Sequence, residues 1–284
     1  MPSSLRHFFS GSLNLLFSLL LSACGTIDIG ERNFIRGDPP GMAPVARLDG
    51  AALLVGGRVE EEEIITLDGA VLRGLSWRPA GATRGVIYFG GNAFHLDQHG
   101  RRLLPLLASC GISVTLFDYR GYGRSSGTPG VQTLAADALR VYDHVAARTP
   151  GGVVVHGQSL GSFMAAHVAQ QRPDLRGLVL EATATTVQDW VDANVPWYVR
   201  LFSTVNVAGD LRAIDNVAAV AGYHGAALVL AGGRDRITPP DLARRVFEAL
   251  PGPSKRWLLT DDAGHNDLFG HKAVMPTYCN FVGS

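Results

Sequence analysis

The chain has 284 residues, which is long enough for one domain with a substantial hydrophobic core. Its 25 basic and 25 acidic residues are interspersed and give a formal net charge of zero. This balance argues against nucleic acid as a partner and against electrostatic attachment to a membrane.

The first 23 residues have the features of a secretory signal peptide and are set apart from the fold. Arg6 supplies a basic start, and residues 15–21 form an apolar run that is too short to span a bilayer as a stable helix. The next positions, Leu21-Ser22-Ala23-Cys24, resemble a bacterial lipobox, in which the cysteine sulfur receives a diacylglycerol group and the leader is cut before it. The alternative is an ordinary secretory peptide with an incidental cysteine.

The lipobox predicts that Cys24 is lipidated and that the protein is anchored in the bacterial cell envelope. Gly25 stands where an Asp is associated with retention in the inner membrane, so in a cell with two membranes the outer one, facing the periplasm, is favoured. Residues 24–50, with the run Gly37-Asp38-Pro39-Pro40-Gly41, are expected to form a tether or irregular arm.

Residues 51–284 have the pattern of an α/β domain. Asp68-Gly69 predicts a hairpin turn between strands at 64–67 and 70–75. Strand–helix units then repeat, which calls for a mostly parallel central sheet with helices on both faces. The acidic run of residues 60–63 is expected to be a solvated turn before the first of these strands.

A candidate nucleophile follows a buried strand at residues 152–156. Gly157-Gln158-Ser159-Leu160-Gly161 has the G-x-S-x-G pattern of a nucleophile elbow, and a helix is predicted over 162–171. The flanking glycines would let strand and helix approach closely around a strained turn. A second match contains Ser125, but a loop follows it, so Ser159 is the favoured nucleophile.

A serine hydroxyl needs a base, and the chain has nine histidines. His265 is favoured because it lies in a loop after the expected strand 257–260, at the sheet edge where Ser159 falls, with His271 as the alternative. Packing roles are expected for His156 and His167. For His95, His99 and His144, we expect solvated positions on the faces of helices.

The base needs an acid that fixes its tautomer. Asp235 follows the expected strand 226–231 on a glycine-rich loop at the same edge, and Glu181, at the end of another strand, is the alternative. An oxyanion hole needs two backbone donors. We expect these to be the amide of Leu160 and the amide of Asn92, in the loop after strand 85–89.

These segments, taken in order, resemble an α/β-hydrolase fold serine hydrolase over about residues 51–282. Residues 117–127, Phe-Asp-Tyr-Arg-Gly-Tyr-Gly-Arg-Ser-Ser-Gly, and the run Gly264-His265-Asn266-Asp267 resemble a branch that includes membrane-associated depalmitoylases and related esterases. The resemblance implies hydrolysis of an acyl ester or thioester, with a small-molecule or lipid-like substrate and without a metal or another cofactor. Many members have His-Gly where this chain has Gly90-Gly91.

The connection over about residues 184–224 is too long for a simple crossover and contains several aromatic residues. We interpret it as a small helical cap whose aromatics line an acyl pocket, the alternative being a helix that packs on the sheet without touching substrate. Cys110 and Cys279 could form a disulfide or remain buried thiols. Two other functions stay open: a peptidase of the same fold, and a catalytically inactive envelope lipoprotein that binds partners.

Overall fold

A computed structural model of the protein describes residues 25–35, 37–39, 41–42 and 45–284. The signal peptide expected over residues 1–23 and the lipidation site expected at Cys24 lie outside these described residues. Within the described ranges, no helix is long and apolar enough to cross a membrane.

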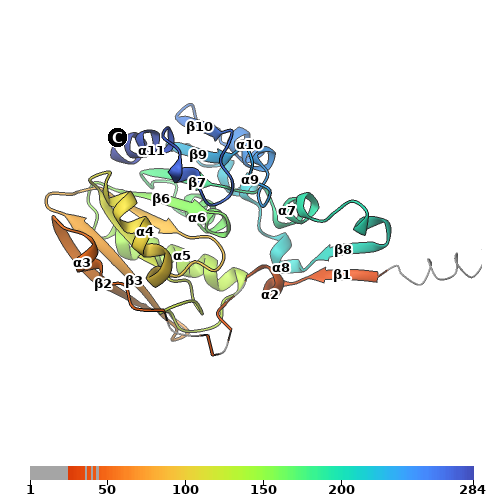
Figure 1. Ribbon diagram of the computed structural model, residues 1–284, viewed down its shortest axis with the longest axis horizontal. Coiled ribbons are helices and arrows are strands. Elements are labelled where there is room, and N and C mark those ends of the chain that lie inside the picture. Colours follow the sequence, from red (N-terminus) through yellow and green to blue (C-terminus); the bar gives the residue numbers. More distant parts are fainter. Residues whose placement is uncertain (1–24, 36, 40, 43–44) are drawn as a thin grey trace, which may run out of the picture.

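An eight-stranded sheet forms the centre of the molecule, in the order β10-β9-β7-β6-β4-β5-β3-β2 (Figure 1). The pairs β2·β3 and β3·β5 are antiparallel, and all other neighbouring strands are parallel. The middle strands are buried along their whole length, as expected of parallel strands that are covered on both faces. The strands are β2 (Gly57–Ile65), β3 (Val71–Pro79), β4 (Gly85–Phe89), β5 (Ser113–Phe117), β6 (Val153–Gln158), β7 (Gly177–Glu181), β9 (Ala227–Gly232) and β10 (Lys255–Thr260).

Helices cover both faces of this sheet, so there are two hydrophobic cores. One core packs α5 (Val131–Ala146), α6 (Leu160–Gln171), α9 (Asn216–Val220) and α10 (Pro240–Ala249) against the sheet. The other includes side chains from α4 (Leu96–Ala108) and α11 (Val274–Gly283), with the short helices α3 (Gly50–Leu53) and η2 (Leu268–Gly270) beside them. The α/β class expected from the sequence is confirmed.

The acidic run was expected to be a solvated turn, and this expectation is wrong. Residues 60–63 lie inside β2, paired with β3. Glu62 is buried and accepts hydrogen bonds from Ser76 (2.6 Å) and Arg148 (2.8 Å), with His144 at 2.9 Å. These contacts hold the pKa of Glu62 below its ordinary value, although burial by itself would raise it.

The structure resolves the open question about the two cysteines of the domain. Cys110 and Cys279 form a disulfide, with their Cα atoms 4.9 Å apart. The bond joins the turn after α4 to α11 across 169 residues of sequence, so it crosslinks two elements on one face of the sheet.

The arm before the domain was expected to be irregular; residues 37–39, 41–42 and 45–49 have no helix or strand, but the described start of the arm is regular. Strand β1 (Gly25–Ile29) pairs in parallel with β8 (Ser203–Val207), and α2 (Glu31–Phe34) follows it. Further along, Asp38 contacts His95 Nε2 (2.6 Å) and accepts a hydrogen bond from the amide of Gly123. His95 is therefore a buried partner of the arm, and the expectation that it is solvated is wrong.

The insertion between β7 and β9 is only partly helical, because it also supplies strand β8. Its other elements are α7 (Val187–Asn194), η1 (Val199–Leu201), α8 (Gly209–Arg212) and α9, which packs on the sheet side. Figure 1 shows β1, β8, α7 and α8 together on one side of the molecule, away from α3 and β2. The start of the arm, β1 and α2, and the elements α7, η1, β8 and α8 of the insertion thus form a single lobe beside the sheet.

Candidate active site

Ser159 occupies a strained turn between β6 and α6. Its backbone angles, φ 54° and ψ −116°, lie in a region that L-residues rarely adopt. The turn is possible because its neighbours lack side chains: a Cβ at Gly157 would collide with the carbonyl of Gly161, and one at Gly161 would collide with the carbonyl of Phe89. The steric role expected for the two glycines is present in the structure.

Backbone strain in the described residues gathers around this turn. The three non-glycine residues with positive φ are Ala93, Ser159 and Ala182, which follow β4, β6 and β7 respectively. Each such residue costs on the order of 1–3 kcal/mol, and strain of this kind clusters at active sites. All three lie at the carboxyl edge of the parallel strands, where ligands of such sheets bind.

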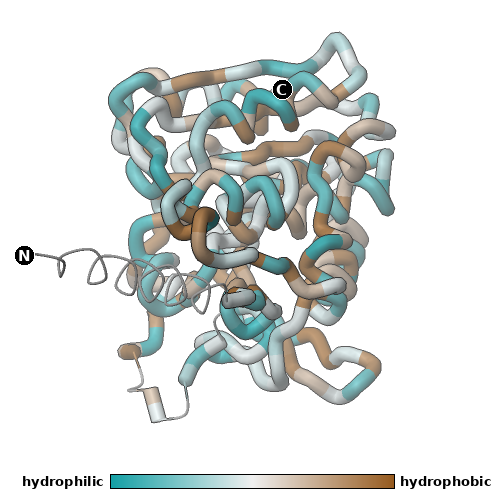
Figure 2. Tube along the Cα trace, turned by 90° about the vertical axis from the view of Figure 1, so that its right-hand side faces the viewer, coloured by the Kyte–Doolittle hydropathy of each residue, from teal (hydrophilic) through white to brown (hydrophobic). Residues whose placement is uncertain are grey.

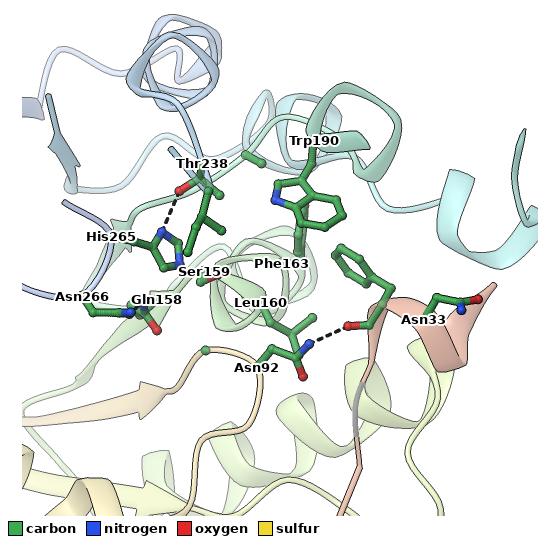
Figure 3. Close-up of a pocket in the computed structure, with 14 residues that line it drawn as sticks. Asn33, Asn92, Gln158, Ser159, Leu160, Phe163, Trp190, Thr238, His265 and Asn266 are labelled. Carbon is green, nitrogen blue, oxygen red and sulfur yellow. Dashed lines mark hydrogen bonds between the residues drawn. The ribbon is translucent and has the colours of Figure 1, made fainter. Parts of the chain in front are cut away.

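Asp235 and His265 are in direct contact at this edge. The Oδ2 atom of Asp235 lies 2.8 Å from His265 Nδ1 and also accepts a hydrogen bond from the hydroxyl of Thr238 (2.7 Å). The other oxygen accepts from the amides of Ile237 and Thr238, both at 2.8 Å. Because the contacts of His265 use Nδ1, its Nε2 is left on the side of Ser159 (Figure 3).

These hydrogen bonds decide the charge of Asp235. Burial would by itself raise the pKa of the carboxyl. The hydrogen bonds from His265 and Thr238, together with the charge of a protonated His265, outweigh burial and hold the pKa of Asp235 below its ordinary value. Asp235 is therefore ionised at neutral pH and oriented toward the imidazole.

A cavity of about 370 Å³ opens beside Ser159 and His265 (Figure 3). Leu160 and Asn92, the residues expected to supply oxyanion donors, line it as well. Most of the lining consists of apolar and amide side chains, and Figure 3 shows Phe163 and Trp190 across the cavity from Gln158 and Asn266. The apolar set is Phe34, Phe163, Ala184, Trp190 and Ile237, and the amides are Asn33, Asn92, Gln158 and Asn266.

The loop that carries Asn92 is held by hydrogen bonds from tyrosines. The hydroxyl of Tyr119 donates to the carbonyl of Gly90 (2.6 Å), and that of Tyr122 donates to Asn92 Oδ1 (3.1 Å). Asn92 Nδ2 donates in turn to the carbonyl of Phe34 (2.6 Å). Two tyrosines and the N-terminal arm thus support the loop in a chain that has Gly90-Gly91 in place of His-Gly.

The arrangement is similar to that of known hydrolases. The sequence profile of the family described as serine aminopeptidase S33 matches residues 83–215. A solved esterase of Pyrococcus furiosus superposes with a TM-score of 0.67, covering 87% of this chain and 98% of that one at 17% identity. The protein has the α/β-hydrolase fold.

Two sequence relatives add detail. An uncharacterised protein of Mycobacterium tuberculosis is 34% identical over 192 residues, which are 66% of this chain and 64% of that protein. The lysophosphatidylserine lipase ABHD12 of Mus musculus is 35% identical over 112 residues, 37% of this chain and 28% of that one. The chain therefore spans less than two thirds of the length of these relatives.

The alternative residues occupy other positions in this α/β-hydrolase fold. The hydroxyl of Ser125 is buried, where it donates to the carbonyl of Asp118 (2.8 Å) and accepts from the amide of Arg73 (2.9 Å). His271 contacts Asp262 (3.2 Å). None of these side chains lines the cavity beside Ser159.

Glu181, the alternative acid, contacts a different histidine. Its carboxyl lies 3.0 Å from His156 Nε2, and His156 Nδ1 lies 3.1 Å from the hydroxyl of Tyr278. Both ring nitrogens of His156 are thereby occupied, and the ring is fully buried. This pair has the spacing of Asp235 and His265 but no nitrogen left for a serine hydroxyl.

Two residues that contribute to the site were not expected from the sequence. Thr238 bonds both Asp235 and His265, and the Asp-x-x-Thr spacing at 235–238 is typical of a turn in which an Asp side chain accepts from amides that follow it. Phe34 lines the cavity from the N-terminal arm, packing against Trp190 with ring centroids 5.4 Å apart. No local pattern in the arm signals that contact.

Proposed function

We propose that the protein is a serine hydrolase that cleaves carboxylic ester or thioester bonds through an acyl-enzyme intermediate. The observation that carries the proposal is the contact between Asp235 and His265 beside a cavity that also receives Ser159 from its strained turn. A serine hydroxyl is a poor nucleophile until a base takes its proton, and an acid behind the base orients it and stabilises its charged form.

In the proposed reaction, Ser159 Oγ attacks the carbonyl carbon while His265 Nε2 takes the hydroxyl proton. The C–O or C–S bond then breaks, and His265 returns the proton to the leaving alcohol or thiol. A water molecule deprotonated by His265 next attacks the acyl-enzyme, which releases the carboxylic acid and restores Ser159. Asp235 stabilises the imidazolium in both steps, and the amides of Leu160 and Asn92 donate to the oxyanion.

The cavity supports an acyl substrate over a peptide. Its apolar wall, with Phe34, Phe163 and Trp190, suits an acyl chain. The family description names an aminopeptidase, which must hold the free ammonium of a peptide. The described lining of this cavity contains no carboxylate that could do so. Two similar proteins, named as an esterase and as a lysophosphatidylserine lipase, also favour ester bonds.

Ser159→Ala should abolish turnover of an activated ester, with kcat reduced by about 10⁴-fold or more. It should also abolish labelling by a fluorophosphonate probe, because the attacking oxygen is lost. Ser125→Ala is the matched control and should retain labelling, since Ser125 bonds only backbone groups away from the cavity. Undiminished labelling of the Ser159→Ala protein would assign the nucleophile elsewhere, and an unlabelled wild type would favour an inactive lipoprotein.

Asp235→Asn should keep the shape of the acid but remove the charge that stabilises the imidazolium, lowering kcat by up to about 10⁴-fold. Glu181→Gln should cost far less, because Glu181 contacts His156 and not His265. The measurement is kcat for both variants on one activated ester, with thermal melts to show that each is folded. If Glu181→Gln loses most of its kcat while Asp235→Asn stays nearly normal, the acid is Glu181 and not Asp235.

Trp190→Ala should shorten the preferred acyl chain. On p-nitrophenyl octanoate we expect kcat/KM to fall about tenfold, the effect of roughly two methylenes that lose their contacts at about 0.8 kcal/mol each. On the acetate, which does not reach the apolar wall, kcat/KM should stay within about twofold by the same reasoning. An equal loss on both esters would show that Trp190 supports the fold rather than the acyl chain.

We also propose that Cys24 is the lipid attachment site and that the protein is held on the outer membrane, facing the periplasm. The lipobox-like Leu21-Ser22-Ala23 before Cys24 supports this. Wild-type chain expressed in a bacterium should incorporate labelled palmitate and fractionate with membranes, whereas Cys24→Ala should take no label. A mass spectrum with Cys24 unmodified, or with the leader cut elsewhere, would refute the proposal.

A further inference from the structure

The lobe formed by the arm and the insertion carries a group of exposed apolar side chains at its outer end. Trp197 is 74% exposed and Leu201 is 62% exposed, which is unusual for side chains of this size. We call the group the apolar tip. Its members, all exposed, are Ile27 on β1, Trp197 and Tyr198 before η1, Leu201 in η1, and Phe202 before β8.

The members of the apolar tip lie close together on the chain and on the paired strands β1 and β8. Four of its members lie within six positions of the insertion, and β1 adds Ile27 through its pairing with β8. The amide of Gly25 donates to the carbonyl of Phe202 (3.3 Å), so the start of β1 lies against the same turn. A cluster of large exposed apolar side chains marks a surface that meets another apolar phase.

Charges around the apolar tip balance within the lobe. Arg200 forms an ion pair with Asp192 (2.7 Å). The neutral amide of Asn206 bridges the other two charges, because it donates to Asp28 (3.0 Å) and accepts from Arg212. The surroundings therefore offer no excess of either sign for an acidic or basic partner. Trp and Tyr are the side chains that favour the boundary between lipid and water, because each combines an apolar ring with a polar atom.

The apolar tip lies between the proposed lipid attachment site and the cavity. Cys24 is covalently next to Gly25, at the edge of the tip. On its inner side, the same lobe supplies Phe34 and Trp190 to the wall of the cavity. Figure 2 views the molecule from the end that carries this lobe.

We propose that the apolar tip inserts into the surface of a lipid bilayer and brings the cavity within reach of acyl chains in that bilayer. The substrate class is then an ester or thioester of a long-chain acyl group that resides in the membrane. Entry of the apolar tip into the bilayer is inferred from the exposed side chains alone, whereas the delivery of substrate rests on the proposed hydrolase function. Because the tip has no charge excess, its binding should be the same on neutral and on anionic lipid and insensitive to salt.

Quenching by brominated lipid tests directly whether the apolar tip enters the bilayer. The full chain is bound to phosphatidylcholine vesicles with or without bromine on the acyl chains, and tryptophan emission is compared. The wild type should be quenched, because Trp197 would sit among the lipid chains, and Trp197→Ser should remove most of the quenching. The remaining tryptophans, Trp77, Trp190 and Trp257, are not among the exposed apolar side chains of the molecule.

A matched control uses Val55, which is 89% exposed and follows α3 at the other end of the molecule (Figure 1). Val55→Trp, introduced into the Trp197→Ser chain, should restore emission but not quenching. The proposal is overturned if wild-type emission is unquenched, if the control is quenched equally, or if the chain does not bind vesicles. It is also overturned if a second copy of the chain, detected by sedimentation, covers the tip and shields Trp197.

Activity gives a second measurement that separates this proposal from the hydrolase proposal. Leu201→Ser combined with Phe202→Ser should lower hydrolysis of a long-chain ester in neutral vesicles by about tenfold or more. The same variant should hydrolyse a water-soluble short ester at the wild-type rate, and Val55→Ser should be normal on both. Equal loss on both esters would overturn delivery by the tip. A wild type inactive on both esters would refute the hydrolase proposal. The quenching result alone would then decide whether the apolar tip enters the bilayer.

Discussion

The site depends on the close contact of three backbone segments, the end of β4, the end of β6 and the start of α6. Gly161 lies so near the carbonyl of Phe89 that no side chain fits between them, and Gly157 lies as near to Gly161. This contact forces Ser159 into its strained conformation. It also fixes the distance from Ser159 to the loop after Phe89, which carries Asn92. The strain, on the order of 1–3 kcal/mol, is offset by the packing of α6 on the sheet.

A contact between a carboxylate and a histidine does not by itself identify a catalytic pair. Two such contacts lie on neighbouring strands of the sheet, Asp235 with His265 at 2.8 Å and Glu181 with His156 at 3.0 Å. The second histidine is enclosed, with both nitrogens occupied. The first is held through Nδ1 alone and faces a cavity. What distinguishes them is the nitrogen left for a substrate-side partner: His265 lies on the loop after β10, whereas His156 lies inside β6.

The features that were predictable from the sequence are those with local signals. The α/β class followed from repeated strand–helix units, and the structure brings Ser159, Asp235 and His265 to one edge because each follows a parallel strand. The errors involve partners far apart in sequence. Residues 60–63 were misassigned because the partners of the buried Glu62 lie up to 86 residues away. The arm was misjudged because β1 pairs with β8, about 180 residues later, and no local pattern encodes that pairing.

That long-range pairing makes the N-terminal arm part of the site rather than a passive connection. Phe34 packs on Trp190 and accepts a hydrogen bond from Asn92 through its carbonyl, so the arm touches both the apolar wall and the loop proposed to hold the oxyanion. A force on the start of β1 would act on β8 through their hydrogen bonds and on the cavity through α2. A chain held at a membrane by its N-terminus would therefore have its substrate wall coupled to the anchor. If the lobe faces the membrane as proposed, this coupling needs no separate moving lid, because the same lobe also supplies Phe34 and Trp190 to the cavity.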